Sequence, residues 1–211
     1  DAIENFSSLP DYIDHYCSEQ SEKNAYANMG GVLSYADLQR YSINFAAYLQ
    51  NETDLIPGDR IAIQLPNLLQ YPVAVMGALR AGLVVVNTNP LYTTEETIEQ
   101  YNGAGVTAVI ILANSAHMLE DVLPATDVHT VIVTQMADLH PLPRRLLINC
   151  MARYIRKIVP RYKLSGSISF RYALKRGSRL ILKKRPFSPE ATALIQYTVG
   201  TMGTPKAAQL S

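Results

Sequence analysis

The sequence predicts an α/β fold, with a doubly wound, mostly parallel sheet flanked by helices and a small N-terminal hairpin. Residues 83–87, 106–112 and 130–134 are almost entirely apolar, as strands are when helices cover both faces of a sheet. Helical patterns separate these runs, and strands that alternate with helices favour parallel pairing. The chain has 211 residues, of which 48% are apolar, so it can bury a sizeable core.

Local patterns predict the elements in order. Ser7 or Ser8 caps a first helix, a Gly30-Gly31 turn joins two short strands, and Ser34 caps a second helix. The apolar stripe of that second helix is Leu38, Tyr41, Phe45, Tyr48 and Leu49. The expected elements that follow are a strand at 60–65, a helix at 69–81 closed by Gly82, a strand at 83–87, a helix at 94–102 closed by Gly103, a strand at 106–112, a helix at 115–123 and a strand at 130–134.

Charge is divided sharply along the chain. Residues 1–138 hold 17 acidic and 4 basic side chains, whereas residues 139–189 hold 14 Lys or Arg and no Asp or Glu. A helix is expected over 144–159, ended by Pro160, with Leu147, Met151, Tyr154, Ile155 and Ile158 on one face and arginines on another. A second short helix is expected over 169–176. Residues 139–189 are therefore interpreted as a basic helical insertion.

Two interpretations of this basic segment, Arg144 to Arg185, stay open. A basic amphipathic helix can lie on an anionic membrane surface. Alternatively, Leu147, Met151 and Ile155 pack the helix onto its own fold, with its arginines solvated or paired with the acidic part of the chain. Nucleic acid is not an expected partner, because the segment has no recognition motif or aromatic-interleaved basic patch.

The sequence shows few signals of cellular location. No apolar run reaches the roughly 18 residues that span a bilayer, and no export signal is visible. Cys17 and Cys150 are expected to be reduced, buried thiols, and the four histidines have no metal-ligand spacing. A cytoplasmic location is expected, with attachment to the inner face of the membrane left open.

The stretch richest in chemistry follows a β-prone run at 193–197. It reads Tyr197-Thr198-Val199-Gly200-Thr201-Met202-Gly203-Thr204-Pro205-Lys206, followed by Ala207 and Ala208. Glycines let backbone N–H groups point at an anion, and hydroxyl and ammonium donors complete a phosphate cradle. An ordinary glycine turn is the plainest alternative. A Walker-type loop does not fit, because it needs Ser or Thr after the Gly-Lys pair.

The loop resembles the phosphate loop of adenylate-forming enzymes, Tyr-Thr-Gly-Gly-Thr-Thr-Gly-x-x-Lys-Gly. The similarity extends through Phe45-Ala-Ala-Tyr-Leu49, Pro57-Gly58-Asp59-Arg60, residues 65–75, Leu79-Arg-Ala-Gly82 and residues 85–93. The segment from Tyr154 to Leu174 narrows the resemblance to the bacterial long-chain fatty acid–CoA ligases. This likeness covers essentially the whole chain, whereas a complete enzyme of that family is more than twice as long. It identifies residues 1–211 as an N-terminal part of the AMP-binding domain.

The resemblance implies a two-step reaction. ATP and a long-chain fatty acid form an acyl-adenylate, and the CoA thiol then displaces AMP. The loop would hold the β- and γ-phosphates through Thr198, Thr201 and the N–H groups of Gly200 and Gly203, with Lys206 supplying positive charge. Thr201 would also lie near Mg²⁺. A homodimer is kept among the expected partners.

Three positions depart from the family pattern: Val199 and Ala207 replace Gly, and Met202 replaces Thr. A β-branched residue resists positive φ, and Met202 removes a hydroxyl donor. Losing one hydrogen bond to a charged group costs on the order of 1.5–3 kcal/mol. Reduced nucleotide affinity is therefore expected.

Several motifs of the family are expected beyond Ser211, among them the adenine-binding segment, a Mg²⁺-binding glutamate and the catalytic lysine. No catalytic residue is assigned within this chain, and the 211-residue polypeptide is expected to be inactive on its own. A catalytically silent relative that acts as a binding module stays open as the alternative. Other polar groups have plainer interpretations. Glu95 and Glu96 complement a helix dipole. Asn87, Asn89 and Pro90 follow the carboxyl end of a strand, where ligands of α/β proteins bind, but a turn-stabilising role is preferred for them.

Overall fold

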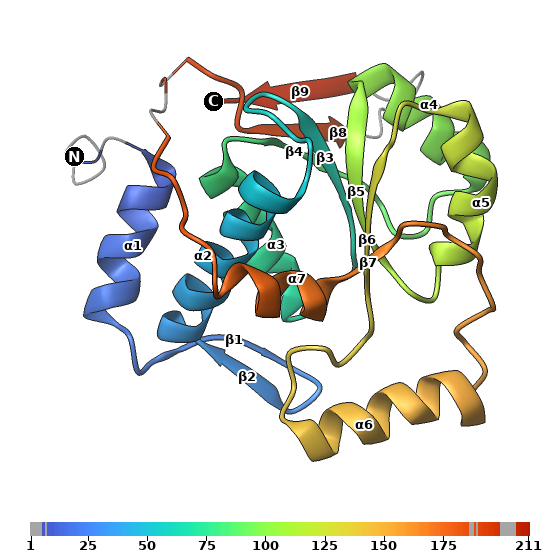
Figure 1. Cartoon of the computed structure of the whole chain (residues 1–211), viewed down its shortest axis with the longest axis horizontal. Helices are drawn as coiled ribbons and strands as arrows, with labels where there is room; N and C mark the ends of the chain where they lie inside the picture. Colours follow the sequence, from blue (N-terminus) through green and yellow to red (C-terminus); the bar gives the residue numbers. More distant parts are fainter. Residues whose placement is uncertain (1–5, 7, 186–187, 189, 199–205) are drawn as a thin grey trace.

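The computed structural model describes residues 6, 8–185, 188, 190–198 and 206–211. Its main feature is a seven-stranded sheet in the order β7-β6-β5-β3-β4-β8-β9, accompanied by a separate two-stranded hairpin, β1-β2 (Figure 1). Neighbouring strands from β7 to β8 run parallel, and β9 alone is antiparallel to its neighbour. The predicted α/β class, with its mostly parallel sheet and N-terminal hairpin, is confirmed.

The strands lie close to the predicted positions. The hairpin is β1 (Asn24–Asn28) with β2 (Gly31–Ser34). The predicted strands of the main sheet are β3 (Arg60–Gln64), β4 (Val84–Asn87), β5 (Val106–Leu112), β6 (Thr130–Thr134) and β8 (Leu194–Thr198). Two edge strands, β7 (Ile168–Ser169) and β9 (Lys206–Leu210), were not predicted. β7 belongs to the basic segment, which therefore contributes to the sheet.

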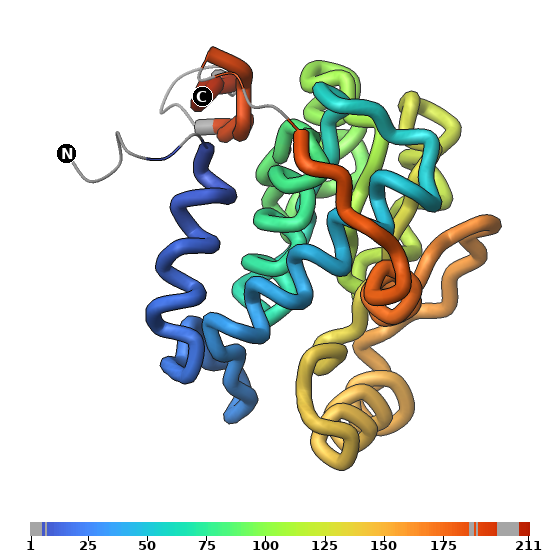
Figure 2. The backbone as a smooth tube through the Cα atoms, turned by 60° about the vertical axis from the view of Figure 1, so that its left-hand side comes forward, coloured from blue at the N-terminus to red at the C-terminus, as the bar shows by residue number. Residues whose placement is uncertain are grey.

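Helices cover both faces of the sheet. The helices are α1 (Leu9–Glu19), α2 (Tyr35–Glu52), α3 (Gln70–Ala81), α4 (Thr94–Ala104), α5 (Leu119–Val122), α6 (Leu142–Cys150) and α7 (Phe170–Gly177). One apolar core lies under α2, α3 and α7, and a second lies under α4 and α5. Figure 2 shows α1 on the outer side of α2 and α6 at one end of the molecule.

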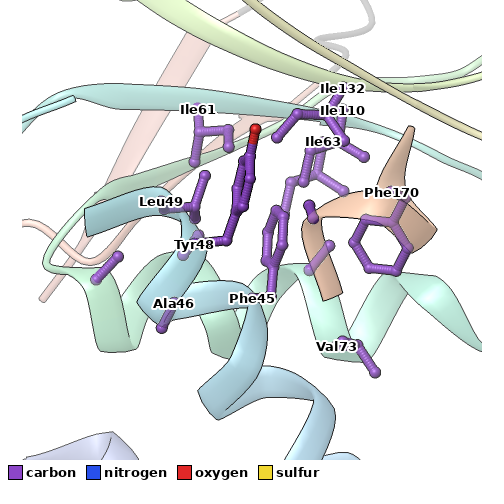
Figure 3. Close-up of a cluster of buried hydrophobic side chains, with 14 of the residues drawn as sticks. Phe45, Ala46, Tyr48, Leu49, Ile61, Ile63, Val73, Ile110, Ile132 and Phe170 are labelled. Carbon is purple, nitrogen blue, oxygen red and sulfur yellow. The ribbon is translucent and has the colours of Figure 1, made fainter. Parts of the chain in front are cut away.

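The first core joins segments that are far apart in sequence. Figure 3 shows Phe45 and Tyr48 of α2 facing the strands, with Phe170 of α7 beside Phe45. The two phenyl rings lie 5.0 Å apart between centroids, and both residues are fully buried. Leu38 and Leu49 are also buried as predicted, and Tyr41 is half-buried. The aromatic contact fixes α7 against α2.

An ion pair ties the first three helices together. Arg80 of α3, whose side chain is 5% exposed, meets the carboxylate of Asp14 in α1 through two N···O contacts of 2.6 and 2.7 Å. The Arg80 Nε also donates to the Ser42 hydroxyl of α2 at 3.0 Å. Burial raises the pKa of Asp14, but the bonds from Arg80 and Gln39 outweigh it and leave the pKa below its usual value.

Two predicted helices differ from the structure, one in its end and one in its type. The helix expected to close at Gly103 continues to Ala104, because Gly105 is the residue with the left-handed φ of 62° that ends it. The helix expected over 115–123 is instead a 3₁₀ turn, Ala116–Met118, then α5 and a second 3₁₀ turn, Leu123–Ala125. Its buried residues Ala116, Leu119 and Val122 are spaced by three, which suits the period of a 3₁₀ helix.

The basic helix also differs from its prediction. It begins at Leu142, two residues early, with Pro143 in its first turn, where the missing N–H is no loss. After Cys150 it continues as a π-helical turn, η4 (Met151–Ile155), rather than running to residue 159. Lys157 then takes a positive φ of 51°, which ends the helix before Pro160 is reached.

The prediction that Leu147 and Ile155 pack this helix onto its own fold was wrong. Leu147 is 61% exposed and Ile155 is 72% exposed, whereas Met151 is half-buried. The expectation of two buried cysteines was also wrong, because Cys17 is buried but Cys150 is exposed; both thiols are free. The apolar face of α6 and η4 points to solvent because no other described element covers it.

Candidate functional site

The predicted phosphate loop begins at the carboxyl end of β8. Strand β8 pairs in parallel with β4, and β9 returns antiparallel beside it, with Tyr197 opposite Ala207 and Thr198 opposite Lys206. Residues 199–205, which hold Val199, Gly200, Thr201, Met202, Gly203, Thr204 and Pro205, lie outside the described residues. The described strands nonetheless anchor both ends of the loop at the sheet edge where ligands of α/β proteins bind.

A network of neutral side chains lies at the same edge, centred on Asn87 at the end of β4. The Tyr71 hydroxyl donates to Asn87 Oδ1 at 2.8 Å, and Asn87 Nδ2 donates to Gln196 Oε1 of β8 at 2.9 Å. The carbonyl of Asn87 accepts from Gln100 Nε2 at 3.0 Å. Asn87 therefore joins α3, α4 and β8 directly below the start of the loop, a role that the turn interpretation missed.

A second, deeper chain of hydrogen bonds supports this network. The buried Tyr101 hydroxyl donates to Gln64 Oε1 at 2.9 Å, and Gln64 Nε2 lies 3.4 Å from the carbonyl of Asn89. Burial raises the pKa of Tyr101 far above its usual value, so its hydroxyl stays protonated as a donor. Gln64, buried at the end of β3, therefore contacts the turn after β4 through the Asn89 carbonyl.

Asn89 has the turn role that was predicted for it. Its Oδ1 accepts from the N–H of Leu91 at 3.0 Å, which is the local bond of an Asx turn. The helix that follows is held by a capping box: Thr93 Oγ1 accepts from the N–H of Glu96 at 3.2 Å, and the Glu96 carboxylate accepts from the N–H of Thr93 at 2.8 Å. The acidic first turn of α4, Glu95 and Glu96, thus has a helix-terminal role.

Tyr197 and Gln196 point to opposite faces of β8. Tyr197 packs into the core under α4, and a Cβ placed on Gly103 would lie 3.5 Å from its hydroxyl. Burial raises the pKa of Tyr197, although the charge of Arg60 lowers it. Ala207 and Ala208 are exposed on β9. Tyr197, one of the predicted phosphate-binding residues, therefore packs β8 against the core under α4.

The network can orient a ligand by hydrogen bonds, since its described members are amides and hydroxyls. Gln100 Oε1 is buried and has no hydrogen-bond partner within the described part of the chain. Within that same part, no group of three or more His, Cys, Asp or Glu side chains is placed to hold a metal. Thr201, the predicted Mg²⁺ neighbour, lies outside it.

Comparison with known proteins supports the predicted family. The family model described as "AMP-binding enzyme" matches residues 13–211. The chain is 44% identical over 208 residues to a long-chain-fatty-acid–CoA ligase of Escherichia coli O157:H7, which covers 99% of this chain and 37% of that protein. A ligase of the same description from Haemophilus influenzae is 43% identical over 206 residues, with 98% and 37% covered. The chain thus spans about 37% of the length of these relatives.

Solved structures show the same fold. A long-chain-fatty-acid–CoA ligase from Archaeoglobus fulgidus superposes with a TM-score of 0.73 at 20% identity, covering 97% of this chain and 36% of that one. An anthranilate CoA ligase in complex with anthranoyl-AMP superposes with a TM-score of 0.76 at 12% identity, covering 99% and 36%. The family match over nearly the whole chain shows that the chain belongs to the AMP-binding enzymes, and its sequence is similar to a part of the bacterial long-chain fatty acid–CoA ligases.

Proposed function

We propose that residues 1–211 form the N-terminal part of the AMP-binding domain of a long-chain fatty acid–CoA ligase, with residues 139–189 as a basic insertion. The complete enzyme would activate a fatty acid with ATP and transfer it to CoA. The observation that carries this proposal is the 44% identity over 208 residues to a ligase of that description. The pairing of β8 with β9, the strands that precede and follow residues 199–205, and the bond from Asn87 to Gln196 of β8 support a phosphate-binding role for the loop.

Nucleotide binding by the loop is tested on the 211-residue chain itself. Calorimetric titration with ATP and Mg²⁺ is expected to show weak binding. Lys206→Ala is expected to weaken this binding further, because an ammonium group next to phosphate is a charge-assisted donor. Lys184→Ala removes an equal charge from an exposed position outside the loop and serves as the matched control. Equal affinities of the two variants would contradict the proposal.

The departures at Val199 and Met202 are proposed to weaken this binding. The Val199→Gly, Met202→Thr double variant is expected to bind ATP about tenfold or more tightly, since one restored hydrogen bond to a charged group contributes about 1.5–3 kcal/mol. An ATP affinity equal to that of the unchanged chain would contradict a weakening by Val199 and Met202. It would favour instead a silent relative that uses this surface as a binding module.

The isolated chain is not expected to produce acyl-CoA, because it spans about 37% of the length of its relatives. Palmitate, ATP, Mg²⁺ and CoA are incubated with the 211-residue chain, and AMP is measured. Formation of AMP above a blank without protein would refute this part of the proposal. Mg²⁺ binding near Thr201 rests on the family resemblance.

We further propose that α6 and η4 attach the protein to the inner face of an anionic membrane. Their exposed apolar side chains are Leu142, Leu146, Leu147, Tyr154 and Ile155, and four exposed or half-exposed arginines, Arg144, Arg145, Arg153 and Arg156, accompany them. Basic residues near an anionic surface each contribute about 1 kcal/mol. Within the described residues, no helix is both long and apolar enough to cross a bilayer.

Sedimentation with vesicles tests this attachment. The chain is expected to sediment with vesicles that contain phosphatidylglycerol and to remain in solution with pure phosphatidylcholine. Leu146→Ser with Leu147→Ser is expected to abolish sedimentation, whereas Ile181→Ser, at an even more exposed apolar residue elsewhere, keeps it. Equal sedimentation of both variants would contradict a role for α6.

A further inference from the structure

A cavity of about 270 Å³ lies between α2, α6, α7 and the segment that follows β6. Strands β5, β3 and β4 separate β6 from β8, and the cavity shares no lining residue with the network around Asn87. Its lining combines residues from positions 40 to 178, so it exists only in the folded chain. It is therefore distinct from the proposed nucleotide site.

The cavity is lined by four cations: Arg40 of α2, Arg145 of α6, and Arg171 and Lys175 of α7. Asp138 is the one carboxylate among the lining residues. Arg40 has a partner outside the cavity, because it forms an ion pair with Asp37 one turn earlier in α2. Cations gathered around one space repel each other, so an anion between them is favoured.

The other three cations, Arg145, Arg171 and Lys175, form no ion pair within the described residues, although burial raises the pKa of Asp138 and the charge of Arg171 lowers it. The Asp138 Oδ2 already accepts from the N–H of Gln135 at 2.9 Å and from the Thr134 hydroxyl at 3.0 Å. This carboxylate therefore belongs to the turn after β6, and the positive charge of the cavity remains in excess.

His140 is a further residue of the lining, held by contacts within the fold. The side chain lines the cavity, and the residue is 4% exposed. Its Nε2 lies 3.1 Å from the carbonyl of Asn28 and therefore carries a proton, and the Cδ2–Nε2 edge of the ring packs on Gly31. The Nδ1 on the opposite edge is buried without a hydrogen-bond partner among the described residues.

A buried nitrogen without a partner costs free energy unless a ligand or water satisfies it. The His140 Nδ1 has almost no accessible surface, so the cations of the lining carry the recognition of a ligand. A phosphate group suits these cations. Guanidinium groups bind its oxygens in pairs, and an ammonium group adds a third donor.

We propose that this cavity binds a phosphate group, held by Arg145, Arg171 and Lys175. The group is either free, as in a small phosphate ester, or the headgroup of a phospholipid. The second source agrees with the position of Arg145 on α6, the helix proposed to lie on the membrane. The phosphate site itself does not depend on membrane attachment or on the loop at β8.

Calorimetric titration of the 211-residue chain with inorganic phosphate and with glycerol 3-phosphate tests the site. Arg171→Gln with Lys175→Gln is expected to weaken binding of both probes at least about tenfold, because two charge-assisted bonds are lost. Arg179→Gln with Lys184→Gln removes the same charge from exposed residues outside the cavity and is expected to leave the affinity unchanged.

Circular dichroism confirms that each variant is folded. No saturable binding of either probe, or equal weakening by the cavity and the surface double variants, would overturn the site.

Vesicles identify the source of the phosphate group. If the ligand is a headgroup, the cavity variant loses sedimentation with vesicles of phosphatidylcholine and phosphatidic acid, whereas the surface variant keeps it. If the ligand is a free phosphate ester, both variants sediment alike but only the cavity variant loses the soluble probes. Leu146→Ser with Leu147→Ser leaves binding of soluble phosphate intact in either case, so failure of membrane attachment is distinguished from failure of the phosphate site.

Discussion

The two helices of the basic segment, α6 and α7, share a composition but not an environment. Both combine apolar residues with Arg or Lys and contain no acidic residue. In α7 the apolar residues Phe170, Ala173 and Leu174 are buried against α2, whereas α6 has no buried residue at all. An amphipathic pattern therefore fixes which face is apolar, but the neighbours decide whether that face is covered.

The largest expected effect separates the apolar faces of the two helices. Phe170→Ala is expected to lower the free energy of unfolding by about 3–5 kcal/mol, because it leaves a cavity beside Phe45. Leu147→Ala, on the exposed face of α6, is expected to change it by less than about 0.5 kcal/mol. Urea unfolding measures both, and similar losses would break the comparison.

Gly177 tests how closely α7 approaches α2. A Cβ at this position would lie 1.8 Å from the carbonyl oxygen of Asn44, so one helix must move. Gly177→Ala is expected to destabilise the fold by about 1–3 kcal/mol, as overpacking does. Cys150→Ala changes an exposed residue of α6 and is expected to be neutral in thermal unfolding. A neutral Gly177→Ala would mean that the contact is looser than the structure shows.

Asp138 lines the cavity between α6 and α7, and its effect on stability depends on pH. Burial raises its pKa above 3.8, against the lowering effects of Gln135, Thr134, Arg171 and Asn149. The folded chain therefore holds this proton to higher pH than the unfolded chain, and the stability from this group is lost as pH rises through the folded pKa. Asp138→Asn is expected to remove that decline, whereas Asp127→Asn, on the exposed surface, keeps it. Identical pH profiles of unfolding would contradict this.

The smallest expected effect concerns Arg176, the cation of α7 that pairs with Glu52 of α2 at 2.7 Å. Arg176→Gln is expected to cost less stability than Gly177→Ala, and the loss should disappear in high salt, because the pair is exposed and screened. Arg153→Gln in η4, which has no carboxylate partner within the described residues, gives the reference. A loss that persists in high salt would indicate packing rather than charge.

The apolar strands were the most predictable part of the fold. Residues 106–112 and 130–134 form β5 and β6 as predicted, because strands buried on both faces must be apolar. The edge strand β7 has only two residues and could not be recognised from a pattern. The end of α4 depended on which of two glycines adopts a positive φ, and the sequence alone does not distinguish Gly103 from Gly105.

The candidate site was predictable only in part. The loop at 197–206 stood out through its glycines, hydroxyls and lysine, and the structure anchors its ends on β8 and β9. The Asn87 network escaped notice because its members come from positions 71, 87, 100 and 196. Amide and hydroxyl side chains carry no local signal of this kind.

The sequence by itself determined the α/β class, the parallel pairing of its apolar strands, the family and the positions of most helices. These properties are local, since periodicity, caps and motifs act within a few residues. Only the tertiary structure decided that α7 is covered and α6 is not, and that Arg145, Arg171, Lys175 and His140 surround one cavity. Contacts between distant segments depend on how the chain closes around its core, and no local pattern records them.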